Sequence, residues 1–274
     1  MAAQRKVCRV VDLGRIGYAD AFALQQRLVA ARKAGAVPDV LLLCEHPHVL
    51  TLGRSGKLEH LRVSGDLLRE MGVEFHSSDR GGDITYHGPG QIVGYPILQL
   101  AEIRRDVVWY VRQLEEAMIR ATASFGVTAF RVPGRTGVWV HPAPNDLGAA
   151  SAKDVARNVA EEKLGAIGVH ISRWVTSHGF AYNVSSDLRY FDLIVPCGIA
   201  DRRATSLEKV LGRPVSIAEV APHLTDALGC VLGLEMASAS REELCEWLAE
   251  AEAVTAGLAT PRYEAPVRSA RENP

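Results

Sequence analysis

The sequence lacks several features that would assign a protein to a familiar class. It has 274 residues but only five cysteines, and no two of them form a Cys-x-x-Cys pair. Because an odd and dispersed set argues against a disulfide framework, we expect reduced thiols, as in a cytoplasm. The same spacing is unfavourable for a zinc site. The cysteines are Cys8, Cys44, Cys197, Cys230 and Cys245.

Long apolar runs and an excess of charge are also missing. No segment approaches the ~18 unbroken apolar residues of a transmembrane helix, and residues 1–11 contain no apolar core of signal-peptide length. The 31 basic residues stand against 32 acidic ones, so no overall field would attract nucleic acid or an anionic membrane. We therefore expect a cytoplasmic protein that has neither as a partner.

Hydrophobic periodicity predicts a mixed succession of strands and helices. Helices are expected at residues 18–34 and 106–125, and two more should follow the capping-box sequences Ser216–Glu219 and Ser240–Glu243. The inner face of the 106–125 helix should carry Val107, Tyr110, Val111, Leu114 and Met118. Strands are expected at residues 7–13, 40–44, 49–52, 73–76, 83–87, 91–97, 127–132, 137–140, 163–171 and 179–184.

This order predicts an α+β protein with a mixed sheet flanked by helices, since strict βαβ alternation is absent. Residues 1–257 are interpreted as one domain. Within it, residues 141–158 are rich in proline, glycine and alanine and are interpreted as a surface insertion. Residues 258–274 contain three prolines and are interpreted as a loose tail.

The stretch from Arg80 to Gln91 is the centre of the sequence argument. It combines a glycine-rich turn, a short alternating strand and a second turn. The glycines at 81 and 82 allow close backbone approaches that a Cβ would prevent. The alternation predicts that Thr85 and His87 face opposite to Ile84 and Tyr86. The pattern suits a ligand site, although an ordinary hairpin with a solvated arginine would look the same.

Two residues stand out as candidates for chemistry. Cys197 lies between Pro196 and Gly198, in a turn that can present a thiol, although an inert turn cysteine is the alternative. Lys163 opens a predicted strand, where a solvated lysine is the commoner case. Two histidines, His87 and His178, precede glycines and could titrate. The His46-Pro47-His48 segment has no third metal ligand nearby, so we expect no metal there.

Arg80–Gln91 resembles the signature of the lipoyl(octanoyl) transferases. Other segments agree with that family in the same order, over roughly residues 8 to 235. They are Leu43–Pro47 with Thr51–Arg54, Lys163–Val169, Ser177–Val184 and Phe191–Ile199. The chain departs from the family at His48, where a second proline is usual, in the longer insertion before Lys163, and in the extended tail.

The resemblance implies the catalytic core shared with lipoate- and biotin-protein ligases. It implies transfer of an octanoyl group from octanoyl-acyl carrier protein to a lysine of a lipoyl domain, in 2-oxoacid dehydrogenases and the glycine cleavage H protein, without cofactor or metal. Cys197 would hold the group as a thioester and Lys163 would shuttle protons. The acyl slot would be lined by Arg80, Gly81, Gly82, Asp83, Ile84, Thr85, Tyr86, His87, Ala166, Ile167, Gly168, Gly179, Phe180 and Ala181.

Two further expectations concern charges and backbone donors. Both partners resemble acidic proteins in their families, and the docking charges would be Arg54, Arg80 and Arg173. Backbone N–H groups near Gly81–Gly82 and Cys197–Gly198 would stabilise the oxyanion.

Three other functions remain as alternatives. An ATP-dependent lipoate- or biotin-protein ligase shares the fold but needs no cysteine, and the Pro196–Gly198 segment does not resemble a nucleotide-binding loop. A non-catalytic acyl-carrier or lipoyl-domain binding protein would tolerate loss of both Cys197 and Lys163. A cysteine hydrolase would need a Cys-His-Asn signature, which the sequence lacks.

Overall fold

The computed structural model describes residues 5–142, 161–195 and 203–258. Its main element is an eight-stranded mixed sheet in the order β11-β1-β2-β6-β10-β9-β8-β7. Strand β1 is parallel to β11 and β2, and the remaining neighbours are antiparallel. The strands are β1 (Lys6–Arg15), β2 (Asp39–Glu45), β6 (Gln91–Ile97), β7 (Ala129–Val132), β8 (Arg135–Val140), β9 (Glu162–Ser172), β10 (Val175–Asn183) and β11 (Leu234–Ser238).

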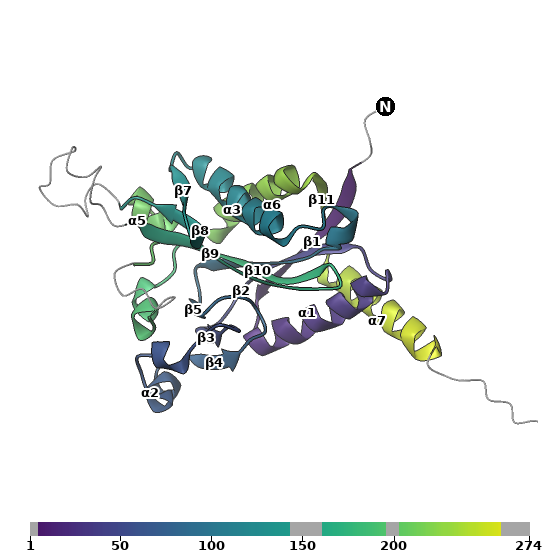
Figure 1. Cartoon of the computed structure of the whole chain (residues 1–274), viewed down its shortest axis with the longest axis horizontal. Helices are drawn as coiled ribbons and strands as arrows, with labels where there is room; N and C mark the ends of the chain where they lie inside the picture. Colours follow the sequence, from purple (N-terminus) through teal and green to yellow (C-terminus); the bar gives the residue numbers. More distant parts are fainter. Residues whose placement is uncertain (1–4, 143–160, 196–202, 259–274) are drawn as a thin grey trace, which may run out of the picture.

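Two pairs of helices cover the faces of the large sheet (Figure 1). Helices α1 (Tyr18–Lys33) and α7 (Arg241–Leu258) pack on one face through a core that includes Leu28 and Leu248. Helices α3 (Val107–Ala123) and α6 (Ile217–Leu232) pack on the other. No helix within the described ranges is both long enough and apolar enough to cross a bilayer.

A three-stranded sheet lies beside the large one on the α1 side (Figure 1). Its order is β4-β3-β5, with β3 parallel to β4 and antiparallel to β5. It has a core of its own, in which Leu50, Tyr86 and Leu193 are buried. Its elements are β3 (Val49–Leu52), β4 (Glu74–Ser77), β5 (Ile84–His87), α2 (Gly65–Glu70) and the 3₁₀ helices η1 (Leu58–His60) and η4 (Leu188–Leu193). The other short helices are η2 (Leu100–Glu102) and α5 (Leu207–Leu211).

Most predicted elements are confirmed within one or two residues of their expected ends, as are both capping boxes. Ser216 and Glu219 exchange their side-chain and backbone hydrogen bonds, and so do Ser240 and Glu243. One prediction for α3 is wrong: Val107 is 44% exposed instead of facing the core. It occupies the first position of the helix, directly after the Asp106 cap. The predicted insertion and tail lie outside the described residues, apart from His141, Pro142 and Leu258.

Candidate active site

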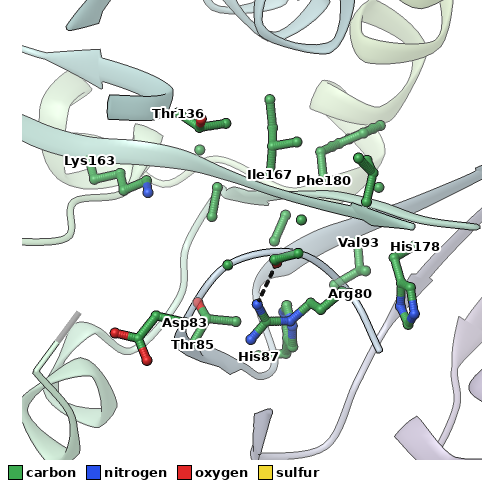
Figure 2. Close-up of a pocket in the computed structure, with 18 of the residues that line it drawn as sticks. Arg80, Asp83, Thr85, His87, Val93, Thr136, Lys163, Ile167, His178 and Phe180 are labelled. Carbon is green, nitrogen blue, oxygen red and sulfur yellow. Dashed lines mark hydrogen bonds between the residues drawn. The ribbon is translucent and has the colours of Figure 1, made fainter. Parts of the chain in front are cut away.

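A cavity of about 540 Å³ lies between the two sheets. Small residues of β9 and β10 leave room for it: Gly168 pairs with Gly179, and Ala166 pairs with Ala181. Between these pairs, Ile167 and Phe180 add apolar wall (Figure 2). The lining is mostly apolar in character but carries several polar groups at defined places, which is the usual composition of a small-molecule site.

Residues 80–83, which we call the cover, close the cavity on the side of the small sheet. The cover touches the large sheet directly: the Gly81 N–H donates to the Val169 carbonyl over 2.9 Å. A Cβ on Gly168 would lie 2.7 Å from the Gly81 carbonyl oxygen, so only glycine permits this approach. The Gly81 N–H is therefore already used, which corrects the expectation that it would serve as an oxyanion donor.

Arg80 is buried rather than available for docking, contrary to the sequence-based expectation. It is 7% exposed. Its Nη2 donates to the Thr51 carbonyl (2.6 Å) and to Thr51 Oγ1 (2.9 Å), and its Nε also donates to Oγ1 (3.1 Å). The planar guanidinium thus fixes the cover to β3. Arg54 and Arg173 are exposed, as a docking role requires.

Two histidines of the lining have depressed basicity. Burial, together with the nearby His46 and Arg80, lowers the pKa of His87 to about 3. Its Nδ1 lies 2.7 Å from Gln91 Oε1. Because the Gln91 amide nitrogen donates to Asn183, its oxygen accepts the Nδ1–H of neutral His87. Burial also lowers the pKa of His178, although its bond to Asp79 acts in the opposite direction.

Lys163 borders the other end of the cavity from His178 (Figure 2). Its backbone is held on both sides, since its N–H donates to the Arg203 carbonyl (2.9 Å) and its carbonyl accepts from Thr205 (3.0 Å). Its Nζ lies 5.3 Å from the centre of the Trp139 ring. A Cβ on Gly137 would lie 2.7 Å from Lys163 Cε, so the side chain runs against a bare backbone. This packing holds the amine at the cavity wall.

Cys197 lies outside the described residues, in the gap between Val195 and Arg203. The described chain on either side of that gap borders the cavity, through Phe191 before it and Arg203 and Ala204 after it.

The structure gathers the other predicted binding positions around this one cavity, with a single exception. Tyr86 is fully buried in the small sheet, stacks on Tyr190, and its hydroxyl lies 2.8 Å from His48 Nδ1. The cause is the alternation of β5, which turns Tyr86 away from the side that carries Thr85 and His87. Ile84 lies on the same side of β5 as Tyr86, but it still lines the cavity.

Sequence reasoning missed several lining residues that come from distant elements. Tyr18 begins α1, Val93 and Tyr95 belong to β6, and Trp139 belongs to β8. The apolar runs of β6 and β8 gave no signal that one side of each strand faces a cavity.

The histidines of the His46-Pro47-His48 segment have other partners. Both ring nitrogens of His46 are used, with Nδ1 2.8 Å from the Ile16 carbonyl and Nε2 2.7 Å from the Tyr95 hydroxyl. His48 stacks on Tyr190 with ring centres 4.1 Å apart. Within the described part of the chain, no three His, Cys, Asp or Glu side chains are grouped as metal ligands.

Comparison with known proteins gives consistent similarities. Residues 17–229 match the family model of the lipoyl protein ligase A/B catalytic domain. The chain is 51% identical over 225 residues to the octanoyltransferase of Acidobacterium capsulatum, covering 79% of this chain and 86% of that protein. It is 48% identical over 229 residues to the octanoyltransferase of Solibacter usitatus, covering 84% of this chain and 94% of that protein.

Solved structures show the same fold at much lower identity. A bipartite lipoate protein ligase from Thermoplasma acidophilum has a TM-score of 0.65 and 16% identity, with 89% of this chain and 91% of that chain covered. A lipoate-protein ligase A bound with ATP has a TM-score of 0.60 and 14% identity, with 90% and 94% covered. These similarities confirm the predicted fold class.

Proposed function

This chain belongs to the lipoyl protein ligase A/B catalytic-domain family, and we propose that it transfers an octanoyl group to lipoyl domains. The donor is octanoyl-acyl carrier protein, and the acceptor is the ε-amino group of a lysine on the lipoyl domain of a 2-oxoacid dehydrogenase or on the glycine cleavage H protein. The observation that carries the proposal is the apolar cavity with Lys163 at one end, in a chain about half identical to octanoyltransferases.

The cavity suits an eight-carbon acyl chain. Its volume of about 540 Å³ falls within the range of sites that enclose small molecules. Burial of six methylenes in it would contribute about 5 kcal/mol at ~0.8 kcal/mol each. The floor of Ala166, Gly168, Gly179 and Ala181 would receive the chain, and the cover would close over it.

The first half-reaction is a thioester exchange. The Cys197 thiolate attacks the octanoyl carbonyl, the carbon–sulfur bond to the carrier breaks, and the departing carrier thiolate takes a proton from the Lys163 ammonium. A free thiol with a pKa near 8.5 is roughly 3% ionised at pH 7. Full ionisation therefore accounts for only about 30-fold, or about 2 kcal/mol, so positioning and oxyanion stabilisation must supply the remainder.

The second half-reaction needs a base. An acceptor lysine with a pKa near 10.4 is about 0.04% neutral at pH 7. Lys163, neutral after the first step, takes one proton from the acceptor ammonium. The amine then attacks the thioester carbonyl, the carbon–sulfur bond to Cys197 breaks, and the second proton of the nitrogen passes to solvent as the Cys197 thiolate leaves. His87 is a poor alternative because burial lowers its pKa to about 3. This cycle returns both residues to their starting states.

The position of Cys197 in this scheme is supported by chain reach. Phe191 and Arg203 both line the cavity, and each is six residues from Cys197. A chain of six residues spans at most about 20 Å when fully extended. Chain length therefore limits Cys197 to about 20 Å or less from Phe191 and from Arg203, both of which line the cavity.

The donor and acceptor would dock at the surface, and exposed Arg54 and Arg173 are suited to acidic partners. We place the reaction in the cytoplasm, where thiols such as the free Cys8, Cys44, Cys230 and Cys245 remain reduced.

Intact-mass measurement after mixing with octanoyl-acyl carrier protein, without ATP, tests the proposal. Wild type should gain an octanoyl adduct that hydroxylamine removes, and Cys197→Ser should give no adduct or a hydroxylamine-resistant one. Lys163→Gln should acylate slowly and transfer poorly. Labelling that occurs only with ATP and free octanoate would refute the proposal and indicate a ligase. No labelling under either condition would indicate a binding protein.

A further inference from the structure

The cover is attached unequally to the two sheets that it joins. Toward the small sheet it makes many bonds: Arg54 N–H donates to the Arg80 carbonyl (3.0 Å), Ser55 N–H donates to the Gly82 carbonyl (3.2 Å), and the Arg80 guanidinium bonds to Thr51. Toward the large sheet, the Gly81 N–H bonds to the Val169 carbonyl. Any separation of the sheets at the cavity would therefore occur along the boundary between the cover and β9–β10.

Asp79, which immediately precedes the cover, crosses that boundary with its side chain. Its Oδ1 lies 2.6 Å from His178 Nε2 on β10, and its Oδ2 lies 2.5 Å from His170 Nδ1 on β9. Both oxygens of one carboxylate thus accept hydrogen bonds from adjacent strands of the large sheet. Arg54 Nη2, 3.3 Å from His170 Nδ1, adds positive charge on the same side.

His178 is held in a conformation that indicates a specific role. Its φ is +53°, which is rare for a residue other than glycine. Its N–H donates to Gln25 Oε1 of α1 (2.8 Å), and its ring stacks on Phe22 with ring centres 5.4 Å apart. His178 is 2% exposed and lines the cavity. In this backbone conformation the imidazole Nε2 reaches Asp79 Oδ1.

We propose that Asp79 is a positioning residue that fastens the cover to the large sheet and keeps water out of the acyl-enzyme. This inference rests on the proposed function. A thioester enclosed in the cavity is protected from hydrolysis only while the cover remains packed against Gly168. If it lifts, water attacks the thioester carbonyl, octanoic acid leaves, and the Cys197 thiol is regenerated without transfer.

The test is the partition of the acyl-enzyme between water and the acceptor lysine. Asp79→Asn keeps the shape of the side chain but offers one acceptor oxygen instead of two. His170→Asn removes the imidazole that contacts Asp79 Oδ2, and His170 does not line the cavity. The control is Asp66→Asn, which removes an exposed carboxylate paired with Arg69 on the small sheet. Preloaded wild type and variants are mixed with a lipoyl domain, and octanoate and octanoyl-lipoyl domain are quantified together with each melting temperature.

We expect Asp79→Asn to raise the ratio of octanoate to transferred octanoyl about tenfold or more, as loss of a charged hydrogen bond implies. His170→Asn should raise it less, and Asp66→Asn should leave it unchanged. A wild-type ratio in both His170→Asn and folded Asp79→Asn would overturn the inference, even if both melted early. Failure of wild type itself to form an acyl-enzyme would instead overturn the proposed function, and this inference with it.

Discussion

Replacement of Gly137 by alanine tests whether the packing of the Lys163 side chain against Gly137 controls catalysis. Gly137 has a φ of +124°, and a Cβ there would lie 2.5 Å from the Gly165 carbonyl oxygen and 2.7 Å from Lys163 Cε. The strand cannot shift easily, because the Gly137 N–H donates to Glu115 Oε1 (3.0 Å). Glu115 is fully buried and paired with Arg112 and Arg131 at 2.7 and 3.0 Å.

Two effects of Gly137→Ala can be separated by magnitude. Strain at the positive φ should lower the free energy of unfolding by about 1–3 kcal/mol. The contact with Cε should also displace the Lys163 amine. A displacement of about 1 Å in a catalytic group can cost on the order of a hundredfold in rate. We therefore expect kcat for octanoyl transfer to fall about a hundredfold, with little change in KM for the donor.

The matched control is Gly126→Ala. Gly126 has a φ of +75° and nothing within 4 Å of an added Cβ, so it introduces backbone strain far from the lysine. Denaturant unfolding and steady-state transfer are measured for both variants. Gly126→Ala should lose stability and keep its kcat. Gly137→Ala with a wild-type kcat would refute the idea that its bare backbone positions Lys163.

Three further predictions concern the cavity and the cover. The pKa of His87 is about 3 in the folded protein and near 6.5 in the unfolded chain, so below pH 6.5 the unfolded state alone binds a proton. The free energy of unfolding should therefore fall by about 2 kcal/mol between pH 7 and pH 5, and His87→Gln should remove that part of the pH dependence in denaturant titrations. Ala181→Leu should fill the cavity floor and lower acylation by octanoyl donors far more than by butanoyl donors, as measured by intact mass. Arg80→Lys loses the forked bonds to Thr51 and should destabilise the protein by about 3 kcal/mol in thermal unfolding, although the charge is kept.

The order of the elements was predictable because it depends on local patterns. Alternation identified β5, helical periodicity identified α1 and α3, and Ser-x-x-Glu sequences identified the starts of α6 and α7. Most of the candidate site was predictable for a related reason: the cover and β5 form one continuous stretch, and a single resemblance located it together with β9 and β10. The same alternation separated Tyr86 from Thr85 and His87.

The unpredictable part of the site depends on contacts between distant residues. Thr51 and Arg80 are 29 positions apart, and nothing near Arg80 in the sequence indicates that a threonine takes its guanidinium. The sequence therefore suggested a docking charge where the structure has a buried support. Gly137 was predicted as an ordinary strand residue, because its importance comes from Lys163 on the neighbouring strand.

A site for an uncharged acyl chain is favoured when charged groups of its lining are already hydrogen-bonded within the protein, and two of these groups are. Arg80 is bonded to Thr51, and Asp83 Oδ2 lies 2.5 Å from His60 Nδ1. Burial keeps His87 neutral. In the proposed mechanism, proton transfer takes place at the end of the cavity where Lys163 lies. Asp79, the residue proposed to exclude water, does not line the cavity and therefore adds no charge to its lining.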